Sequence, residues 1–159
     1  MRGLALALAV LLLAAPLTTA AQSGLPLPRF VSLRADEVNV RTGPGVRYPI
    51  AWVFVRAGLP VEVVEEFENW RKIRDVDGAE GWVHQSLLSG TRAAVVVGGV
   101  RLLTRTPAAN GIPVLEAEPG VVGELLECRQ DWCRMEIAGR RGWLPQDQIW
   151  GAYAGETFR

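Results

Sequence analysis

Two cysteines are the side chains best suited to chemistry in this chain of 159 residues. Cys128 and Cys133 are the only cysteines, and the segment between them, Arg129-Gln130-Asp131-Trp132, corresponds to a turn that also occurs earlier in the chain. In an oxidising compartment an even, closely spaced pair indicates a disulfide, which neighbouring antiparallel strands have the geometry to close. A redox pair or half of a zinc site is the alternative, but the spacing is not Cys-x-x-Cys and zinc would need two more ligands. We predict a Cys128–Cys133 disulfide and no metal site.

His84 is the only histidine, and it is followed by Gln85 and Ser86. A hydrolase would need a nucleophile, a base and an orienting acid within mutual reach. No segment around Ser86 or Ser89 resembles a strained nucleophile turn. We therefore predict that no residue is catalytic and that the protein is not an enzyme. His84 is then a surface or interface side chain.

The segment Gly43-Pro44-Gly45 is typical of a tight turn, because glycine tolerates positive φ and proline fixes φ. A glycine-rich phosphate cradle would need a helix N-terminus directly after it, and Tyr48-Pro49 argues against one. We predict no cofactor.

Residues 1–20 have the pattern of a secretory signal peptide, with Arg2, then an apolar run, then small residues. The uninterrupted run is shorter than the roughly 20 residues that a spanning helix needs, and Pro16 breaks it. We predict cleavage after Ala20 or Ala21 and no stable membrane insertion afterwards.

The charge balance of the remaining chain argues against a nucleic-acid partner. Without Arg2 the chain keeps 16 of its 17 basic residues, against 17 acidic ones. A protein that binds phosphate backbone would carry a basic face, whereas acidic side chains accompany the arginine clusters here. We interpret these charges as solvated strand faces.

Most of the chain after the predicted signal peptide consists of two copies of one sequence pattern. Gly58 corresponds to Gly120 and Asn69-Trp70 to Asp131-Trp132, in both cases 62 residues apart. Such a repeat indicates two tandem domains. The same spacing pairs Val38-Asn39-Val40 with Val100-Arg101-Leu102 and Leu33 with Val95, and after a slip of one residue Gly81-Trp82-Val83 meets Gly142-Trp143-Leu144.

Short strands are the elements that these two copies predict. Apolar and polar residues alternate with period two, as in Val38-Asn39-Val40-Arg41, and turn residues interrupt the alternation at short intervals. This pattern favours a small antiparallel barrel or sandwich, without a helix. A sixty-residue domain buries only about 60% of its unfolded surface, so we expect the two copies to pack together. The join over 89–92 is too short to act as a flexible tether.

The predicted organisation is a signal peptide over 1–20, a mature N-terminal segment over 21–29, domains over 30–91 and 92–150, and a tail over 151–159. Large aromatic residues sit at and beyond the end of the second domain. Exposed aromatics suggest a contact surface for a partner. Packing of Trp150 and Tyr153 between the two domains is the alternative.

The first copy resembles the bacterial SH3-like domain. The motifs that carry the resemblance arrive in order: Val38-Asn39-Val40-Arg41-Thr42-Gly43-Pro44-Gly45, Tyr48-Pro49-Ile50, Trp70-Arg71-Lys72-Ile73 and Gly81-Trp82-Val83. The resemblance covers nearly all of residues 30–150 and looks like a periplasmic branch with two repeats. It implies an all-β chain of two tandem small SH3-like barrels packed together. Domains of this group bind or dock, and several direct enzymes to the cell wall or contact peptidoglycan peptides.

The second copy departs from the family pattern, since it lacks the Gly-Pro-Gly turn and the tyrosine after it. A ligand site borne by that turn is therefore expected only in the first copy. Tyr48 and Trp52 have no aromatic counterparts, so they are candidates for a groove in which a flat ring stacks on a sugar or peptide. A role in the core is the alternative for Trp52. We predict that Tyr48, Trp52, Trp82 and His84 bind the ligand. Tryptophans found in both copies favour packing instead: Trp70, Trp82, Trp132 and Trp143.

From the resemblance and the leader we expect an exported binding module, periplasmic or else secreted. Its expected ligand is a cell-wall peptide or glycan. Docking on another periplasmic protein is the alternative.

Overall fold

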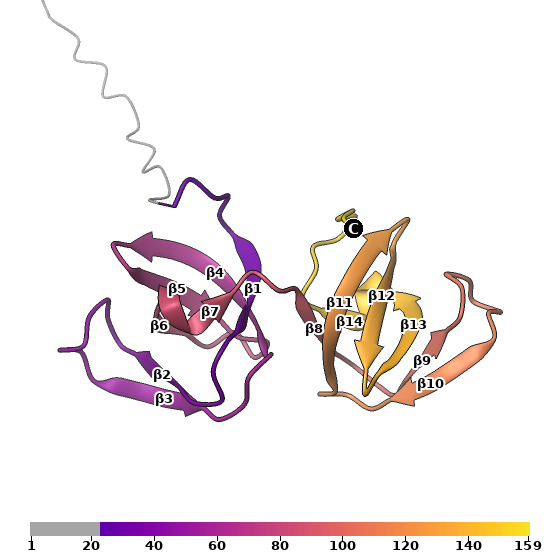
Figure 1. The fold of residues 1–159 in the computed structure, drawn as a ribbon, viewed down its shortest axis with the longest axis horizontal. Helices are drawn as coiled ribbons and strands as arrows, with labels where there is room; N and C mark the ends of the chain where they lie inside the picture. The colour runs from indigo at the N-terminus through magenta and orange to yellow at the C-terminus, as the bar shows by residue number, and fades with distance from the viewer. Residues whose placement is uncertain (1–22) are drawn as a thin grey trace, which may run out of the picture.

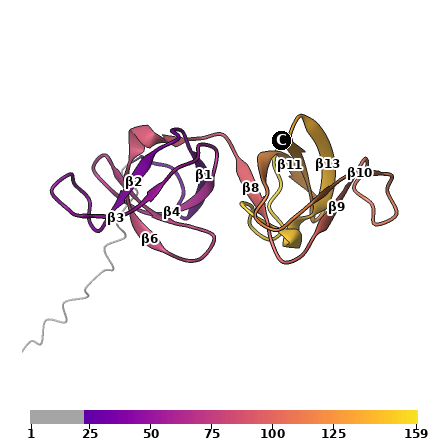
Figure 2. The same ribbon diagram turned by 90° about the horizontal axis from the view of Figure 1, so that it is seen from below.

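The computed structural model describes residues 23–159 and consists of two antiparallel β-sheets of seven strands each. The predicted signal peptide over 1–20 lies outside the described residues. Each sheet curls into a small barrel, and the barrels lie side by side, joined by the segment that leads into β8 (Ala93–Val96) (Figures 1 and 2). The predicted fold, all-β with two tandem SH3-like barrels packed together, is confirmed. Within residues 23–159, no helix is long and apolar enough to cross a bilayer.

The first sheet has the strand order β3-β2-β6-β5-β4-β1-β7. Between β6 and β7 the chain makes one turn of 3-10 helix, η1 (Gln85–Leu87). The strands are β1 (Arg29–Leu33), β2 (Val38–Arg41), β3 (Ile50–Phe54), β4 (Pro60–Phe67), β5 (Trp70–Arg74), β6 (Glu80–His84) and β7 (Leu88–Ser89).

The second sheet repeats this order as β10-β9-β13-β12-β11-β8-β14, so each strand corresponds to the one seven places earlier. The turn η2 (Gln146–Gln148) corresponds to η1. After β8 the strands are β9 (Arg101–Thr104), β10 (Pro113–Ala117), β11 (Val122–Arg129), β12 (Trp132–Ile137), β13 (Arg140–Pro145) and β14 (Ile149–Trp150).

Each barrel has its own apolar core. Val38 and Val40 of β2 are fully buried and pack with Ile73 of β5, as the alternating pattern predicts. Met135 and Leu144 occupy the equivalent core of the second barrel. Burying a side chain of this size stabilises by about 1.5–3 kcal/mol, so the two copies fold around separate cores of similar make-up.

The register of the repeat differs from the sequence-based prediction over the first three strands. Arg41 pairs with Trp82, whereas Thr104 pairs with Trp143, which gives a spacing of 63 residues (104 minus 41). Val40 therefore corresponds to Leu103, and both are fully buried. The predicted match of Val38-Asn39-Val40 with Val100-Arg101-Leu102 is therefore wrong by one residue.

The same correction applies on either side of this strand. The N–H of Gly58 donates to the carbonyl of Leu33 and that of Gly120 to Val96, so Leu33 corresponds to Val96 and not to Val95. The connection before Gly120 is one residue shorter than the connection before Gly58, which restores the spacing of 62 at these glycines. Because Gly58 and Gly120 lie 62 residues apart, their spacing does not reveal that the strands before them correspond at a spacing of 63 residues.

One cross-strand pair of side chains is an ion pair in the first copy and a disulfide in the second. Glu66 of β4 lies opposite Arg71 of β5, and at the equivalent positions Cys128 of β11 lies opposite Cys133 of β12. The cysteines form the predicted disulfide, with their Cα atoms 4.1 Å apart. In the first barrel the Arg71 Nε lies 3.2 Å from Glu66 Oε1. An ion pair therefore occupies in one hairpin the place that a covalent bond occupies in the other.

The Glu66 carboxylate is nearly inaccessible, with 1% of its side chain exposed. Burial raises its pKa, but hydrogen bonds from the Ser23 hydroxyl and backbone N–H and from Arg29, together with the charge of Arg71, outweigh burial and lower the pKa to about 2. Ser23 and Arg29 reach this carboxylate at 2.6 and 2.7 Å. Glu66 is thus a fully partnered buried anion.

Loss of the disulfide is expected to destabilise the second barrel by about 2 kcal/mol, the chain-entropy value for so short a loop. Cys128 and Cys133 are both buried in the core, so alanine at both positions also leaves space unfilled. Urea unfolding of the Cys128→Ala/Cys133→Ala variant against the oxidised protein measures the loss. A free energy of unfolding within about 0.5 kcal/mol of the oxidised protein would contradict the prediction.

The two barrels are held together by aromatic and charged contacts that involve the tail. Phe30 of β1 packs against Trp150 edge-to-face, with ring centroids 5.0 Å apart, and against Tyr153 at 4.8 Å. The Tyr153 hydroxyl donates to Glu62 Oε1 of β4 at 2.9 Å. Arg92, in the join, forms an ion pair with Glu156 of the tail at 2.7 Å. Of the two roles expected for the tail, packing between the barrels is the one observed for Trp150 and Tyr153.

Candidate functional site

The loop between β2 and β3 is shaped by Tyr48. Its ring lies so close to Gly43 that a Cβ atom there would overlap it, so only glycine fits this position. Arg41 also fixes the loop, because its Nη1 donates to the Tyr48 carbonyl at 2.8 Å. The guanidinium of Arg47 lies over the Tyr48 ring, 5.1 Å from its centroid. Tyr48 is half-buried, so much of its surface serves the packing of the loop.

An open depression of about 550 Å³ lies between this loop and the β4–β5 turn. Residues 44–47 form one wall, and Phe67, Glu68 and Trp70 form the other, with His84 between them. The Phe67 side chain is 47% exposed. Aromatic faces beside a few polar groups can stack on a sugar ring or a peptide plane and fix its orientation.

His84, which lines the depression, is held by two neighbouring side chains. Its ring meets the Trp70 ring edge-to-face, with centroids 5.5 Å apart. Nδ1 lies 2.7 Å from the Ser86 hydroxyl and accepts the Ser86 backbone N–H, so His84 caps η1. Among residues 23–159 no carboxylate is hydrogen-bonded to His84, and the arrangement lacks the orienting acid of a triad.

A buried arginine positions the turn that bears the aromatic wall. Glu68 has φ of 48°, a conformation that costs energy for any residue except glycine. Arg71 Nη1 donates to the Glu68 carbonyl at 2.8 Å, and its Nη2 donates to Gln85 Oε1 at 2.6 Å. Arg71 therefore ties the β4–β5 turn to the residue that follows His84.

The four predicted site residues do not all line the same cavity. Only His84 lines the depression, while Tyr48 supports the loop that forms its other wall. Trp52 packs on the core of the first barrel, with its indole beside Gly81. Trp82 is 9% exposed and belongs to the barrel wall. The structure thus brings one of the four side chains to the cavity and assigns two of the others to packing.

Sequence reasoning did not single out Phe67 and Trp70 as site residues. Trp70 was interpreted as a packing residue because Trp132 repeats it, yet both rings line surface cavities. A usable signal in the sequence was Phe67, an aromatic residue at the end of a strand directly after Glu65-Glu66, which has Arg129 as its counterpart. An aromatic residue on the solvent side of a strand is more informative than one that repeats.

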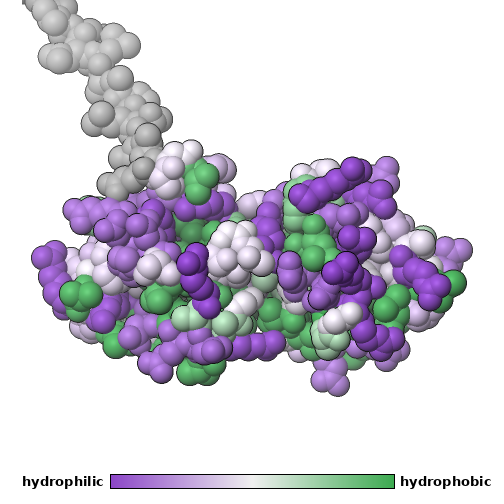
Figure 3. Space-filling view, in the orientation of Figure 1, coloured by the Kyte–Doolittle hydropathy of each residue, from purple (hydrophilic) through white to green (hydrophobic). Residues whose placement is uncertain are grey.

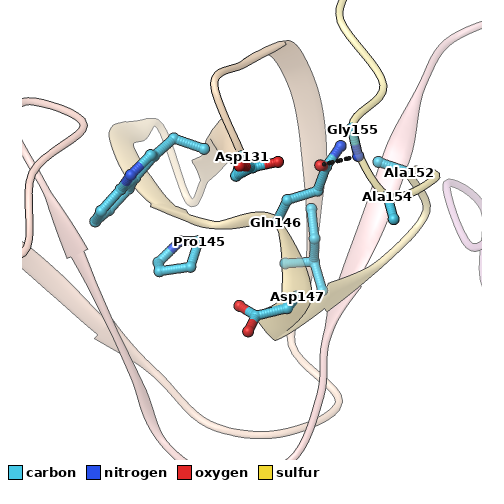
Figure 4. A pocket seen from close by; sticks show the side chains of 9 residues that line it. Asp131, Pro145, Gln146, Asp147, Ala152, Ala154 and Gly155 are labelled. Atoms are coloured by element: carbon cyan, nitrogen blue, oxygen red, sulfur yellow. Dashed lines mark hydrogen bonds between the residues drawn. The ribbon is translucent and has the colours of Figure 1, made fainter.

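The second barrel carries a different cavity, of about 520 Å³, at the position of Trp132 (Figure 4). The tail closes one side of it, since the Gly155 N–H donates to Gln146 Oε1 at 2.9 Å. Asp131 and Asp147 are the charged side chains in its lining. The space equivalent to the first depression, beside residues 108–109 and Trp132, is smaller, at about 270 Å³, and has Pro145 in place of His84, so the two copies present different surfaces.

Comparison with known proteins connects this geometry to a family. The family model described as bacterial SH3 domain matches residues 34–90 and 103–151. A Bacillus subtilis (strain 168) protein, YrvJ, whose name provisionally assigns it as an N-acetylmuramoyl-L-alanine amidase, is 24% identical over 128 residues. That alignment covers 74% of this chain but 24% of the relative, so the chain spans about a quarter of the length of the amidase-named protein.

Solved structures with a similar arrangement include NlpC2 and NlpC1 from Trichomonas vaginalis, at TM-scores of 0.38 and 0.36 and identities of 11% and 14%. They cover 79% and 86% of this chain, and 49% and 50% of their own length. An NlpC/P60 family protein from Bacillus cereus ATCC 10987 has a TM-score of 0.35 and 13% identity, over 76% of this chain and 55% of its own. Because the family model matches both barrels and more than half of the residues, the chain belongs to the bacterial SH3 domain family.

Proposed function

We propose that this protein is an exported, non-enzymatic binding module that recognises a cell-wall peptide or glycan through its first barrel. The observation that carries the proposal is the open depression between the β2–β3 loop and the β4–β5 turn, with Phe67, Trp70 and His84 facing it. A pair of aromatic faces with one titratable ring suits a ligand that combines sugar or peptide planes with polar groups.

Membership of the bacterial SH3 family and similarity to a protein named as a cell-wall amidase support this choice of ligand class. Wall binding would require export, which agrees with the leader-like pattern of residues 1–20 and with the disulfide. We propose the periplasm as its location and 30–91 and 92–150 as the bounds of its two domains, of which the first binds the ligand. The cavity of the second barrel, with Asp131 and Asp147 in its lining, differs from the depression of the first, so we propose no common ligand for the two.

Co-sedimentation of the mature chain with purified peptidoglycan sacculi tests the proposal. We expect saturable binding that weakens about tenfold in the Arg47→Ala/Phe67→Ala variant, because each lost face or charge contributes about 0.5–1.5 kcal/mol. Both side chains are exposed, so the variant should fold. Ile112→Ala, at an exposed site of the second barrel, is the matched control and should bind as the unaltered protein does.

Absence of pelleting at every concentration would contradict wall recognition. Equal binding by the Arg47→Ala/Phe67→Ala variant and the control would contradict the assignment of the site while leaving the ligand class in place. Docking on another exported protein is the second candidate function, and the exposed Val53 of β3 and Val55 directly after it favour it.

A further inference from the structure

The outer edge of the first sheet is an unpaired apolar strand. β3 is the terminal strand of its sheet, so one row of its backbone N–H and C=O groups has no strand partner among residues 23–159. From Ile50 to Val55 every residue is apolar. Val53 and Val55 are 40% and 80% exposed. Apolar side chains lie along the lower side of the molecule in Figure 3, where Figure 1 places β3.

The second barrel protects the equivalent edge. At the spacing of 63, Pro113 replaces Ile50, Glu116 replaces Val53 and Glu118 replaces Val55. Arg140 also donates a hydrogen bond to the carbonyl of Val114 in β10. Proline, charge and a capped carbonyl are the devices by which proteins prevent an edge strand from pairing with another chain.

The edge strand β10 thus carries a proline, a charged side chain and a carbonyl that is hydrogen-bonded to a side chain, whereas β3 has none of these three features among the described residues. Val114 corresponds to Ala51, whose carbonyl accepts no side-chain hydrogen bond from any residue in 23–159. We propose that β3 accepts an extended segment of a partner protein as an added antiparallel strand. This contact uses the edge of β3 and not the aromatic wall of the depression, although Arg47 before the strand also lines that depression.

The charges around β3 define the partner segment. Exposed arginines stand beyond both ends of the strand, Arg47 before it and Arg56 after it, and neither forms an ion pair within residues 23–159. A fitting segment alternates apolar residues, which align with Val53 and Val55, and carries acidic residues at its ends. Glutamates at these ends would meet the two arginines.

A second copy of this chain is a poorer occupant. An edge of five residues is about 17 Å long, and at a sheet thickness of about 10 Å its footprint is roughly 170 Å². Stable dimers bury about 800 Å² per partner. Two β3 strands would also bring their flanking arginines toward one another.

Nuclear magnetic resonance of the mature chain tests this contact. The probe is a blocked seven-residue peptide in which valine and threonine alternate between terminal glutamates. We expect the amide signals of β3 to shift and hydrogen exchange at Ala51 and Val53 to slow about tenfold at millimolar peptide. In Val53→Glu/Val55→Glu, which copies the second barrel, the affinity should fall at least about tenfold.

Val100→Glu, at an exposed position of the second barrel, is the matched control and should keep the affinity. No shift at about 5 mM peptide, or shifts confined to the Phe67–Trp70 turn, would overturn the proposal. Broadening of the β3 signals with protein concentration alone would assign the edge to a second copy and overturn the choice of a partner protein. Sacculus binding by Val53→Glu/Val55→Glu should be unchanged, which separates this result from failure of the wall-binding proposal.

Discussion

Replacing Arg71 by methionine is expected to destabilise the first barrel by about 3 kcal/mol, because it removes one partner of a buried ion pair. The substitution leaves the carbonyls of Glu68 and Trp70 and the amide of Gln85 without their donor. Glu66 keeps Arg29 and Ser23, which limits the loss. Thermal unfolding should show a midpoint lower by roughly 10–20 °C.

The disulfide of the second barrel suggests a variant that should restore stability to the first barrel. Because Glu66 and Arg71 occupy the positions of Cys128 and Cys133, the Glu66→Cys/Arg71→Cys variant should form a second disulfide and recover about 2 kcal/mol on oxidation. Mass measurement of free thiols confirms the bond independently of stability. A loss below about 1 kcal/mol for Arg71→Met would contradict the structural role given to this ion pair.

Acid should destabilise the protein through Glu66. Its pKa is about 2 in the folded protein and about 4.5 when unperturbed. A carboxyl whose pKa is lowered by folding contributes stability above its unfolded pKa and loses that contribution as the pH falls through the folded value. The contribution of Glu66 is at most about 3 kcal/mol, and about 2 kcal/mol of it should be gone by pH 2.5.

Urea unfolding at pH 5 and pH 2.5 checks this expectation with Glu66→Gln as the comparison. The variant should be less stable at pH 5 and should lose about 2 kcal/mol less than the unaltered protein on acidification. Other carboxylates with lowered pKa values, Glu80 and Glu156, remain in both proteins, so the difference isolates Glu66. Parallel pH curves for the two proteins would contradict the assignment.

Much of the fold could be predicted because strand alternation is local. Val38 and Val40 face the core as their period predicts, and the pair Cys128 and Cys133 lies across a hairpin. The register of the first strands was missed because Gly58 and Gly120 occupy equivalent turns after connections of unequal length. Only backbone pairing with Trp82 and Trp143 fixes that register.

The site was harder to predict, because exposure depends on contacts between distant segments. Trp52 lacks an aromatic counterpart, which suggested a ligand role, yet its ring fills the space beside Gly81, a glycine far along the chain. Phe67 is exposed because the β4–β5 turn projects it beside the β2–β3 loop. Only His84 among the predicted residues could be located from its place after the Gly-Trp-Val strand.

The hydrogen bond from Tyr153 to Glu62, with Phe30 packed between Trp150 and Tyr153, has a consequence for any polymer that meets the protein. When two binding surfaces are linked at a set separation, the second event takes place at an effective concentration that depends on how well the ligand's repeat matches that separation. If the cavities of both barrels bind the same polymer, a strand whose chemical groups recur at the separation of the two cavities is expected to bind with higher avidity than a strand with another repeat.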